Sequence, residues 1–127
     1  GKLGVVPGSM GSPGFIVRGK GNAKSFNSCS HGAGRVMSRA AAFRTLKHAD
    51  MKKILKEQGI SLIGGTLDES PEVYKDINKV IDGQRDLVDV RAKLEPKLVR
   101  MAAEGNQWGN KKKKKKPENK GDGDVCM

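Results

Sequence analysis

Short apolar runs separated by glycine and proline open the chain. The first run, at residues 3–6 (LGVV), and the second, at residues 15–17 (FIV), consist largely of strand-forming residues. Between them lies a loop rich in glycine and proline, and Gly19 and Gly21 close the second run. The pattern predicts a strand, a glycine-rich loop and a second strand.

Apolar residues recur at spacings of three and four from about Gly34, which predicts a helix. Its apolar positions are Val36, Met37, Ala40, Ala41 and Leu46. A second helix is predicted with Asp50 as its N-cap and Gly59 at its end. The apolar face of this second helix would consist of Met51, Ile54 and Leu55.

The remaining pattern up to residue 102 mixes strands with one more helix. Residues 60–66 (ISLIGGT) predict a short strand, and the Ser–Pro pair at 70–71 is a good helix entry. Residues 86–94 (DLVDVRAKL) are ambiguous between strand and helix, and residues 97–101 (KLVRM) predict a closing strand after Pro96. We expect an α+β fold of mixed strands with two or three helices, with apolar surface left exposed where a missing part would pack.

From about residue 103 the chain loses this periodicity and becomes polar and low in complexity, which predicts disorder. We therefore divide the chain into a folded part, residues 1–102, and a lysine-rich tail, residues 103–127. The six lysines at 111–116 could serve nuclear import or bind nucleic acid loosely, and a solvated tail is an equal alternative. Because Gly1 lies next to a strand-like run, we interpret the chain as a piece of a longer protein.

Positive charge is spread over the whole chain. The net charge is +11, and residues 1–102 carry 18 lysines and arginines against 10 acids. A basic body favours a polyanionic partner, most often nucleic acid, although many basic surfaces bind nothing specific. Cys29 and Cys126 form neither a disulfide framework nor a zinc pattern, so we expect a reducing compartment, the cytoplasm. We expect no membrane association, because no apolar run approaches the ~20 residues that span a bilayer.

Two glycine-rich stretches near the start of the chain are candidates for phosphate contact. GFIVRGKG nearly matches a P-loop, but Gly21 stands where Ser or Thr should hold magnesium, and its β-branched residues suit a strand. We therefore exclude that class of nucleotide triphosphatase. PGSMGSPG, at residues 7–14, offers backbone N–H groups and the hydroxyls of Ser9 and Ser12 to a phosphate or a sugar. It could equally be a simple turn.

The stretch SCSHGAGRVMSR joins a histidine to a glycine-rich turn and two arginines. Gly32 and Gly34 let backbone approach a ligand closely, and a helix starting there would present free N–H groups. Arg35 and Arg39 would share one face of that helix. The arrangement suits a phosphate beside His31, whose neutral imidazole nitrogen can attack phosphorus. Metal binding and a structural role remain alternatives for this histidine.

Cys29 is a second candidate nucleophile. In an extended stretch its side chain would point to the same side as His31, two residues later. A packed cysteine is the interpretation we favour.

Taken in order, these stretches resemble one family. PGSMGS followed by SFNSCSHGAGRVMSR, and later ESPEVYKDINKVIDGQRDLVDV and KLEPKLV, is similar to the C-terminal part of the RtcB-type RNA ligases, also called tRNA-splicing ligases. The resemblance covers residues from about 3 to 102. It implies an enzyme that uses GTP and manganese to join RNA 2′,3′-cyclic phosphate or 3′-phosphate ends to 5′-hydroxyl ends, as in tRNA splicing and RNA repair.

The resemblance also implies roles for individual residues. His31 would be the guanylate acceptor, and its GMP would activate the RNA 3′-phosphate. Arg35 would face the RNA phosphate or the GMP phosphate, and Tyr74 would lie near the guanine. The GMP site would be lined by Pro7, Gly8, Ser9, Met10, Gly32, Ala33 and Gly34.

The chain departs from the family pattern at two positions. Gly14 stands where the family usually has a serine, and Met101 stands where it usually has a lysine that touches the guanine. The family's manganese ligands belong to an N-terminal part that this chain lacks. We therefore expect no metal ligands here, an N-terminal ligase portion and RNA as partners, and no ligation by the isolated chain. The alternatives are a non-catalytic basic RNA-binding remnant and a relic that does not fold alone.

Overall fold

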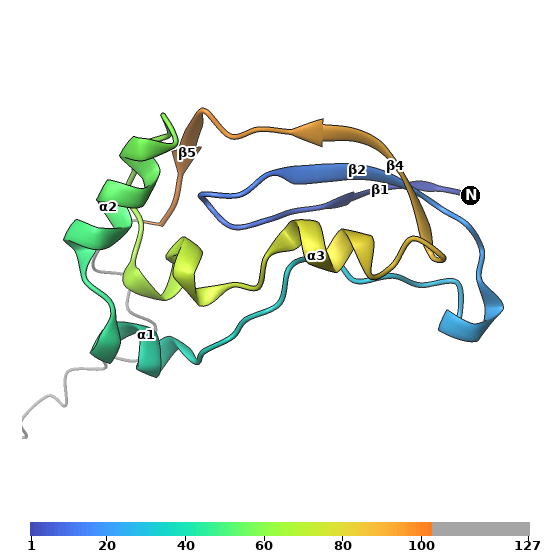
Figure 1. The fold of residues 1–127 in the computed structure, drawn as a ribbon, viewed down its shortest axis with the longest axis horizontal. Helices are drawn as coiled ribbons and strands as arrows, with labels where there is room; N and C mark the ends of the chain where they lie inside the picture. Colours follow the sequence, from blue (N-terminus) through green and yellow to red (C-terminus); the bar gives the residue numbers. More distant parts are fainter. Residues whose placement is uncertain (103–127) are drawn as a thin grey trace, which may run out of the picture.

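The computed structural model describes residues 1–102; the predicted tail at 103–127 lies outside the described residues. The main sheet has three antiparallel strands, in the order β1 (Leu3–Val6), β2 (Gly14–Gly19) and β4 (Val88–Leu94). Helix α3 (Ile77–Asp82) runs along one side of this sheet (Figure 1).

The first core lies between this sheet and α3. Phe15 and Val17 of β2 are two residues apart, so they point to the same face, where they pack with Ile77 and Ile81 of α3. These four residues are 6% exposed or less. The same cluster is completed by Val6, Ala33 and Val88.

Apolar side chains remain exposed on the strands. Leu3 and Val5 of β1 are 62% and 64% exposed, and Leu94 of β4 is 49% exposed. Leu3 and Val5 share a face, because residues two apart in a strand point the same way. The expectation of exposed apolar surface is confirmed for these positions.

A second core lies at the α2 end of the molecule (Figure 1). It is formed by α2 (His48–Glu57) and by two parallel strands, β3 (Ser61–Ile63) and β5 (Leu98–Arg100). Its buried residues are Met10, Met51, Leu55 and Ile60. Because Met10 comes from the glycine-rich loop between β1 and β2, this core also anchors that loop.

The remaining segments are short turns, one short helix and extended chain. Short 3₁₀ turns cover η1 (Ala23–Ser25), η2 (Leu67–Glu69) and η3 (Pro71–Val73), and α1 covers Arg39–Thr45. Just before α1, the segment 34–36 pairs with 73–75. The Val36 N–H donates to the Val73 carbonyl at 2.8 Å, and the Lys75 N–H donates to the Gly34 carbonyl at 2.9 Å.

The α+β fold is confirmed, while several helix boundaries were wrong. The helix predicted from about Gly34 begins at Arg39, because residues 34–36 bond to the segment 73–75 instead. The second helix begins at His48 with Lys47 as N-cap, so Asp50 lies in its first turn. The ambiguous residues 86–94 contain strand β4.

Two further elements are shorter than predicted. The strand at 60–66 is limited to Ser61–Ile63. The Ser–Pro entry at 70–71 opens only the 3₁₀ turn η3, and the α-helix starts at Ile77, where the Asp76 side chain accepts from the Asn78 N–H at 2.9 Å. A carboxylate N-cap thus replaces the predicted proline start.

Candidate functional site

The two glycine-rich stretches meet in the folded chain. A Cβ added to Gly32 would lie 3.5 Å from the Pro7 carbonyl oxygen, so the histidine turn packs directly beside the loop 7–14. That loop is closed by its own serines, whose Oγ atoms lie 2.5 Å apart in Ser9 and Ser12. At Gly8 a Cβ would come within 2.3 Å of the Pro13 carbonyl oxygen, so only glycine fits this tight loop.

The backbone on both sides of His31 is held in place. The Ser30 N–H donates to Gln84 Oε1 at 2.9 Å, and Ser30 Oγ donates to the Gly32 carbonyl at 2.6 Å. Ala33 is 6% exposed and belongs to the first core. His31 itself is exposed, and within residues 1–102 no hydrogen bond or ion pair engages its imidazole. Both ring nitrogens therefore remain available to a ligand.

Gly34 turns the chain away from His31 toward Tyr74. Its φ of +78° lies in the left-handed region, which side chains other than glycine adopt only with strain. The turn sends Arg35 into an antiparallel bridge with Tyr74. Because the helix starts only at Arg39, the predicted free helix N-terminus behind His31 does not form. Helix α1 has Ser38 as its N-cap, and the Ser38 Oγ accepts from the Ala41 N–H at 3.1 Å.

The Arg35 guanidinium is fixed by contacts within the chain. Its Nη2 donates to the Asp68 carbonyl at 2.7 Å, and its Nε donates to the Met37 carbonyl at 3.2 Å. It also lies over the Tyr74 ring, 5.3 Å from the centroid, and Nη1 donates to the Tyr74 hydroxyl at 3.3 Å. Three of its five N–H donors are used, which leaves two for another acceptor.

Arg39 approaches the same place from the first turn of α1. Its Nη1 donates to the Asp68 carboxylate and, at 2.8 Å, to Glu69 Oε1. The Tyr74 hydroxyl donates to the other Glu69 oxygen, Oε2, at 2.5 Å. The prediction that Arg35 and Arg39 share a helix face is wrong, yet both arginines converge on the acids of η2.

Sequence reasoning missed Asp68 and Glu69 as part of this site. Both lie in η2, about thirty positions from the arginines, and no short spacing links them. The one available signal is two acids at the head of the stretch that carries Tyr74.

Burial and hydrogen bonding shift three pKa values in this network. Burial opposes the charge on Asp68, but hydrogen bonds from Thr66 and Arg39 outweigh it and hold the pKa of that carboxyl below its usual value. The hydrogen bonds to Asp68 and Glu69 raise the pKa of Arg39. Burial, followed by the hydrogen bond to Glu69, raises the pKa of Tyr74. The raised pKa of Tyr74 keeps its phenol neutral at neutral pH, and the lowered pKa of Asp68 keeps its carboxyl ionised there.

Gly14 and Met101, the two positions at which the resemblance leads us to expect a departure from the family pattern, are accommodated differently. At Gly14 a Cβ would find its nearest neighbour, the Val6 carbonyl oxygen, at 3.7 Å, so the fold leaves room for a serine there. Met101 is partly buried and packs against the second core. Its side chain therefore serves packing in this chain. Cys29 is exposed, so the expectation of a packed cysteine is wrong.

The described residues do not offer a metal site. No group of three histidine, cysteine, aspartate or glutamate side chains within 1–102 is arranged to hold a metal ion. We therefore assign no metal ligand to these residues. Among the helices of this part, none is both long and apolar enough to cross a membrane.

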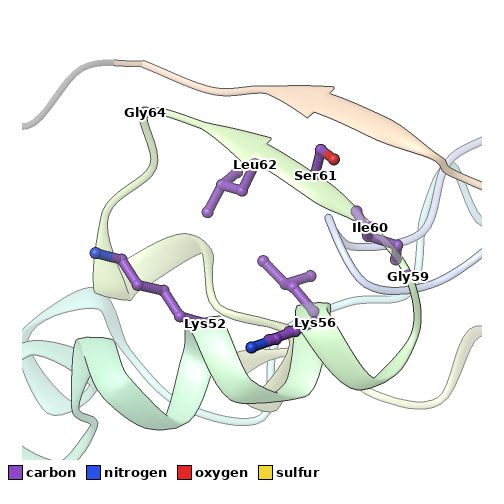
Figure 2. Close-up of a pocket in the computed structure, with 8 residues that line it drawn as sticks. Lys52, Lys56, Gly59, Ile60, Ser61, Leu62 and Gly64 are labelled. Carbon is purple, nitrogen blue, oxygen red and sulfur yellow. The ribbon is translucent and has the colours of Figure 1, made fainter.

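A basic groove lies between α2 and β3, away from His31. Its volume is about 660 Å³. Lys52 and Lys56, one helical turn apart on α2, stand on its helix side, and Leu62 of β3 lies opposite them (Figure 2). Neither lysine forms an ion pair with any residue of the described part. The groove combines an apolar wall with two unpaired positive charges.

Fold and site together define an α+β unit with an exposed histidine in a glycine-rich turn, beside a fixed arginine and tyrosine. The family model described as tRNA-splicing ligase RtcB matches residues 1–102, and the chain belongs to this family. The resemblance drawn from the sequence motifs is thereby confirmed.

Individual relatives show how much of the family's chain is present. The RNA-splicing ligase RtcB of Escherichia coli K12 is 48% identical over 90 residues, which cover 71% of this chain and 22% of the relative. The tRNA-splicing ligase RtcB of Archaeoglobus fulgidus is 44% identical over 84 residues, 61% of this chain and 17% of the relative. The RNA-splicing ligase RtcB of Mycobacterium tuberculosis is 37% identical over 82 residues, 61% of this chain and 19% of the relative. The chain thus spans about a fifth of the length of these curated relatives.

Proposed function

We propose that this chain supplies the nucleotide-accepting portion of an RNA ligase that joins 3′-phosphate or 2′,3′-cyclic phosphate ends to 5′-hydroxyl ends. One observation carries the proposal. The His31 imidazole is exposed and unbonded within the described part, in a turn whose neighbours on both sides are fixed. A nucleophile needs this combination of an available atom and a rigid support.

In the proposed reaction GTP is a substrate and His31 is the nucleophile. A ring nitrogen of His31 attacks the α-phosphorus, an N–P bond forms, and the P–O bond to the diphosphate leaving group breaks. The neighbouring glycines place no side chain between backbone and phosphate. We assign the walls of the site to Pro7, Gly8, Ser9, Met10, Gly32, Ala33 and Gly34, with Tyr74 near the base.

Arg35 is proposed to hold a phosphate during this reaction. Its guanidinium is already oriented by two backbone carbonyls and the Tyr74 hydroxyl, and its two remaining donors suit phosphate oxygens. The transferred guanylate would then activate the RNA 3′-phosphate for attack by the 5′-hydroxyl. Manganese would be bound by the part of the family's chain that is absent from these residues.

The test is a two-part assembly. The chain is mixed with the N-terminal part of the Escherichia coli K12 relative, about four fifths of its length, and with α-labelled GTP and manganese. We expect acid-labile label on this chain only in the mixture, and none on His31→Ala. The matched variant Cys29→Ala should keep the label. An unlabelled mixture overturns the proposed function, and labelling of the isolated chain overturns its dependence on the missing part.

The groove of Figure 2 favours a second function, RNA binding without catalysis. Lys52 and Lys56, which have no ion pair among residues 1–102, suit the phosphates of RNA. We expect His31→Ala to bind RNA as the wild type does, and Lys52→Gln with Lys56→Gln to bind it more weakly. Lys79→Gln, at an exposed position of α3, is the control. Binding that does not fall with rising salt contradicts this function, because phosphate contacts release counterions.

A further inference from the structure

We propose that Glu69 is a positioning residue that fixes Tyr74 and the two arginines beside the histidine turn. The inference rests on the proposed function, which places Tyr74 at the guanine and Arg35 at a phosphate. It adds an element that no motif of the sequence indicated. The Glu69 carboxylate in η2 would determine the positions of Tyr74, proposed to lie at the guanine, and of Arg35, proposed to hold a phosphate.

The two oxygens of Glu69 have different partners. Oε2 accepts from the Tyr74 hydroxyl at 2.5 Å, and Oε1 accepts from Arg39 Nη1 at 2.8 Å. Arg35 Nη1 lies 4.0 Å from the same Oε1. Glu69 therefore links three side chains from three segments. Arg35 lies in the bridged segment before α1, Arg39 lies in the first turn of α1, and Tyr74 follows η3.

The exposure of these side chains separates an inner pair from an outer arginine. The side chains of Arg35 and Glu69 are 26% and 27% exposed, whereas that of Arg39 is 63% exposed. Arg35 has other partners, but Tyr74 has only Glu69 and Arg35 for its hydroxyl in the described part. Loss of the Glu69 carboxylate thus leaves the Tyr74 hydroxyl with Arg35 as its partner in the described part and removes the acceptor that orients the phenol.

Asp68 does not duplicate this role. Its carboxylate accepts from Thr66 and Arg39, while only its backbone carbonyl reaches Arg35. No hydrogen bond joins it to the Tyr74 hydroxyl within residues 1–102. Asp68 anchors the outer arginine, and Glu69 alone connects that arginine to the tyrosine.

The chain contains a built-in probe for this arrangement, because Tyr74 is its single tyrosine. Titration of the phenol, followed by tyrosinate absorbance on the intact chain, should show a lower midpoint in Glu69→Gln than in the wild type. The glutamine keeps the shape but removes the negative charge that opposes ionisation. Glu72→Gln is the matched control, since Glu72 is exposed and its carboxylate accepts a single hydrogen bond within residues 1–102, from Ser70 Oγ at 3.4 Å.

An unchanged midpoint in Glu69→Gln overturns the inference. Circular dichroism confirms that each variant is folded. If Glu69→Gln is not folded, Glu69→Asp takes its place. Its side chain is one methylene shorter, which draws the carboxylate away from the Tyr74 hydroxyl that it contacts at 2.5 Å in the wild type, so its midpoint should also fall.

The second readout is guanylation in the two-part assembly. We expect Glu69→Gln to lower the rate about tenfold to a hundredfold through misplacement of Tyr74 and Arg35, with Glu72→Gln at the wild-type rate. A wild-type rate in Glu69→Gln overturns the positioning role. If the wild type itself takes no label, the proposed function is overturned, and the Tyr74 titration decides on Glu69 by itself.

Discussion

Arg35 lies across the face of Tyr74, with its guanidinium carbon 5.3 Å from the ring centroid and its Nη1 3.3 Å from the phenol oxygen. The two residues are also partners in an isolated antiparallel bridge. Backbone pairing and side-chain stacking therefore both hold Arg35 and Tyr74 in the same relative position. This is why the segment after the histidine turn is extended, although its sequence has helical spacing.

The first prediction concerns the shape of the Arg35 guanidinium. Arg35→Lys keeps the charge but cannot reach the Asp68 and Met37 carbonyls and the Tyr74 hydroxyl at once. We expect the free energy of unfolding to fall by about 1–3 kcal/mol, as for loss of partly buried hydrogen bonds from a charged group. Urea unfolding followed by circular dichroism measures it.

Arg44→Lys supplies the control for that prediction. Arg44 is exposed in the last turn of α1, so the same exchange should change the free energy of unfolding by less than about 0.5 kcal/mol. Equal losses in the two variants would show that the Arg35 contacts contribute nothing specific.

Much of this fold could be predicted from local patterns. The runs at 3–6 and 15–17 became β1 and β2, because strand-forming residues beside glycine and proline leave few other choices. The histidine turn and the loop 7–14 were also identified as candidates, and they lie together. The conformation of each of these elements is determined by a few residues that are neighbours in the sequence.

The rest depends on contacts between distant segments. The helix predicted at Gly34 failed because the backbone of 34–36 bonds to 73–75, a pairing that no local spacing reveals. The ion pairs of Asp68 and Glu69 could not be predicted for the same reason, because their arginine partners lie about thirty residues away in the sequence. The pairing of residues 34–36 with 73–75 outweighed the helix propensity of the local sequence. The same pairing brings the arginines close to Asp68 and Glu69.

A second prediction tests the turn at Gly34. Gly34→Ala places a Cβ on a residue with φ of +78°, so we expect a loss of about 1 kcal/mol or more in the free energy of unfolding. Gly4→Ala, in β1, is matched to it, because a Cβ there meets nothing within 4 Å. Chemical denaturation of both variants should show that only Gly34→Ala is weakened.

The third prediction is a dependence of stability on pH. The folded-state pKa of Asp68 lies below its usual value, so the carboxylate adds stability above the unfolded pKa of about 3.9. That contribution is lost as pH falls through the lower, folded pKa. The difference in unfolding free energy between wild type and Asp68→Asn should therefore be largest near neutrality and shrink below about pH 4.

Denaturation at neutral and acidic pH measures this difference. Asp82→Asn, which removes an exposed ion pair with Arg85, should differ little from the wild type at either pH. If the Asp68→Asn difference stayed constant down to acidic pH, the bonds from Thr66 and Arg39 would not be stabilising the ionised carboxyl.

The last prediction concerns Met101, where the resemblance leads us to expect a lysine in the family. Met101 packs against the second core beside Met10, Met51 and Leu55, so this position contributes buried apolar surface in the present chain. Met101→Lys should lower the free energy of unfolding by about 1–3 kcal/mol, because the ammonium must leave the core and takes part of the packing with it. Met101→Leu conserves apolar volume and should cost less than about 1.5 kcal/mol. Equal stability of the lysine and leucine variants would mean that this position is free to carry the family's residue, and that its methionine is not required for packing.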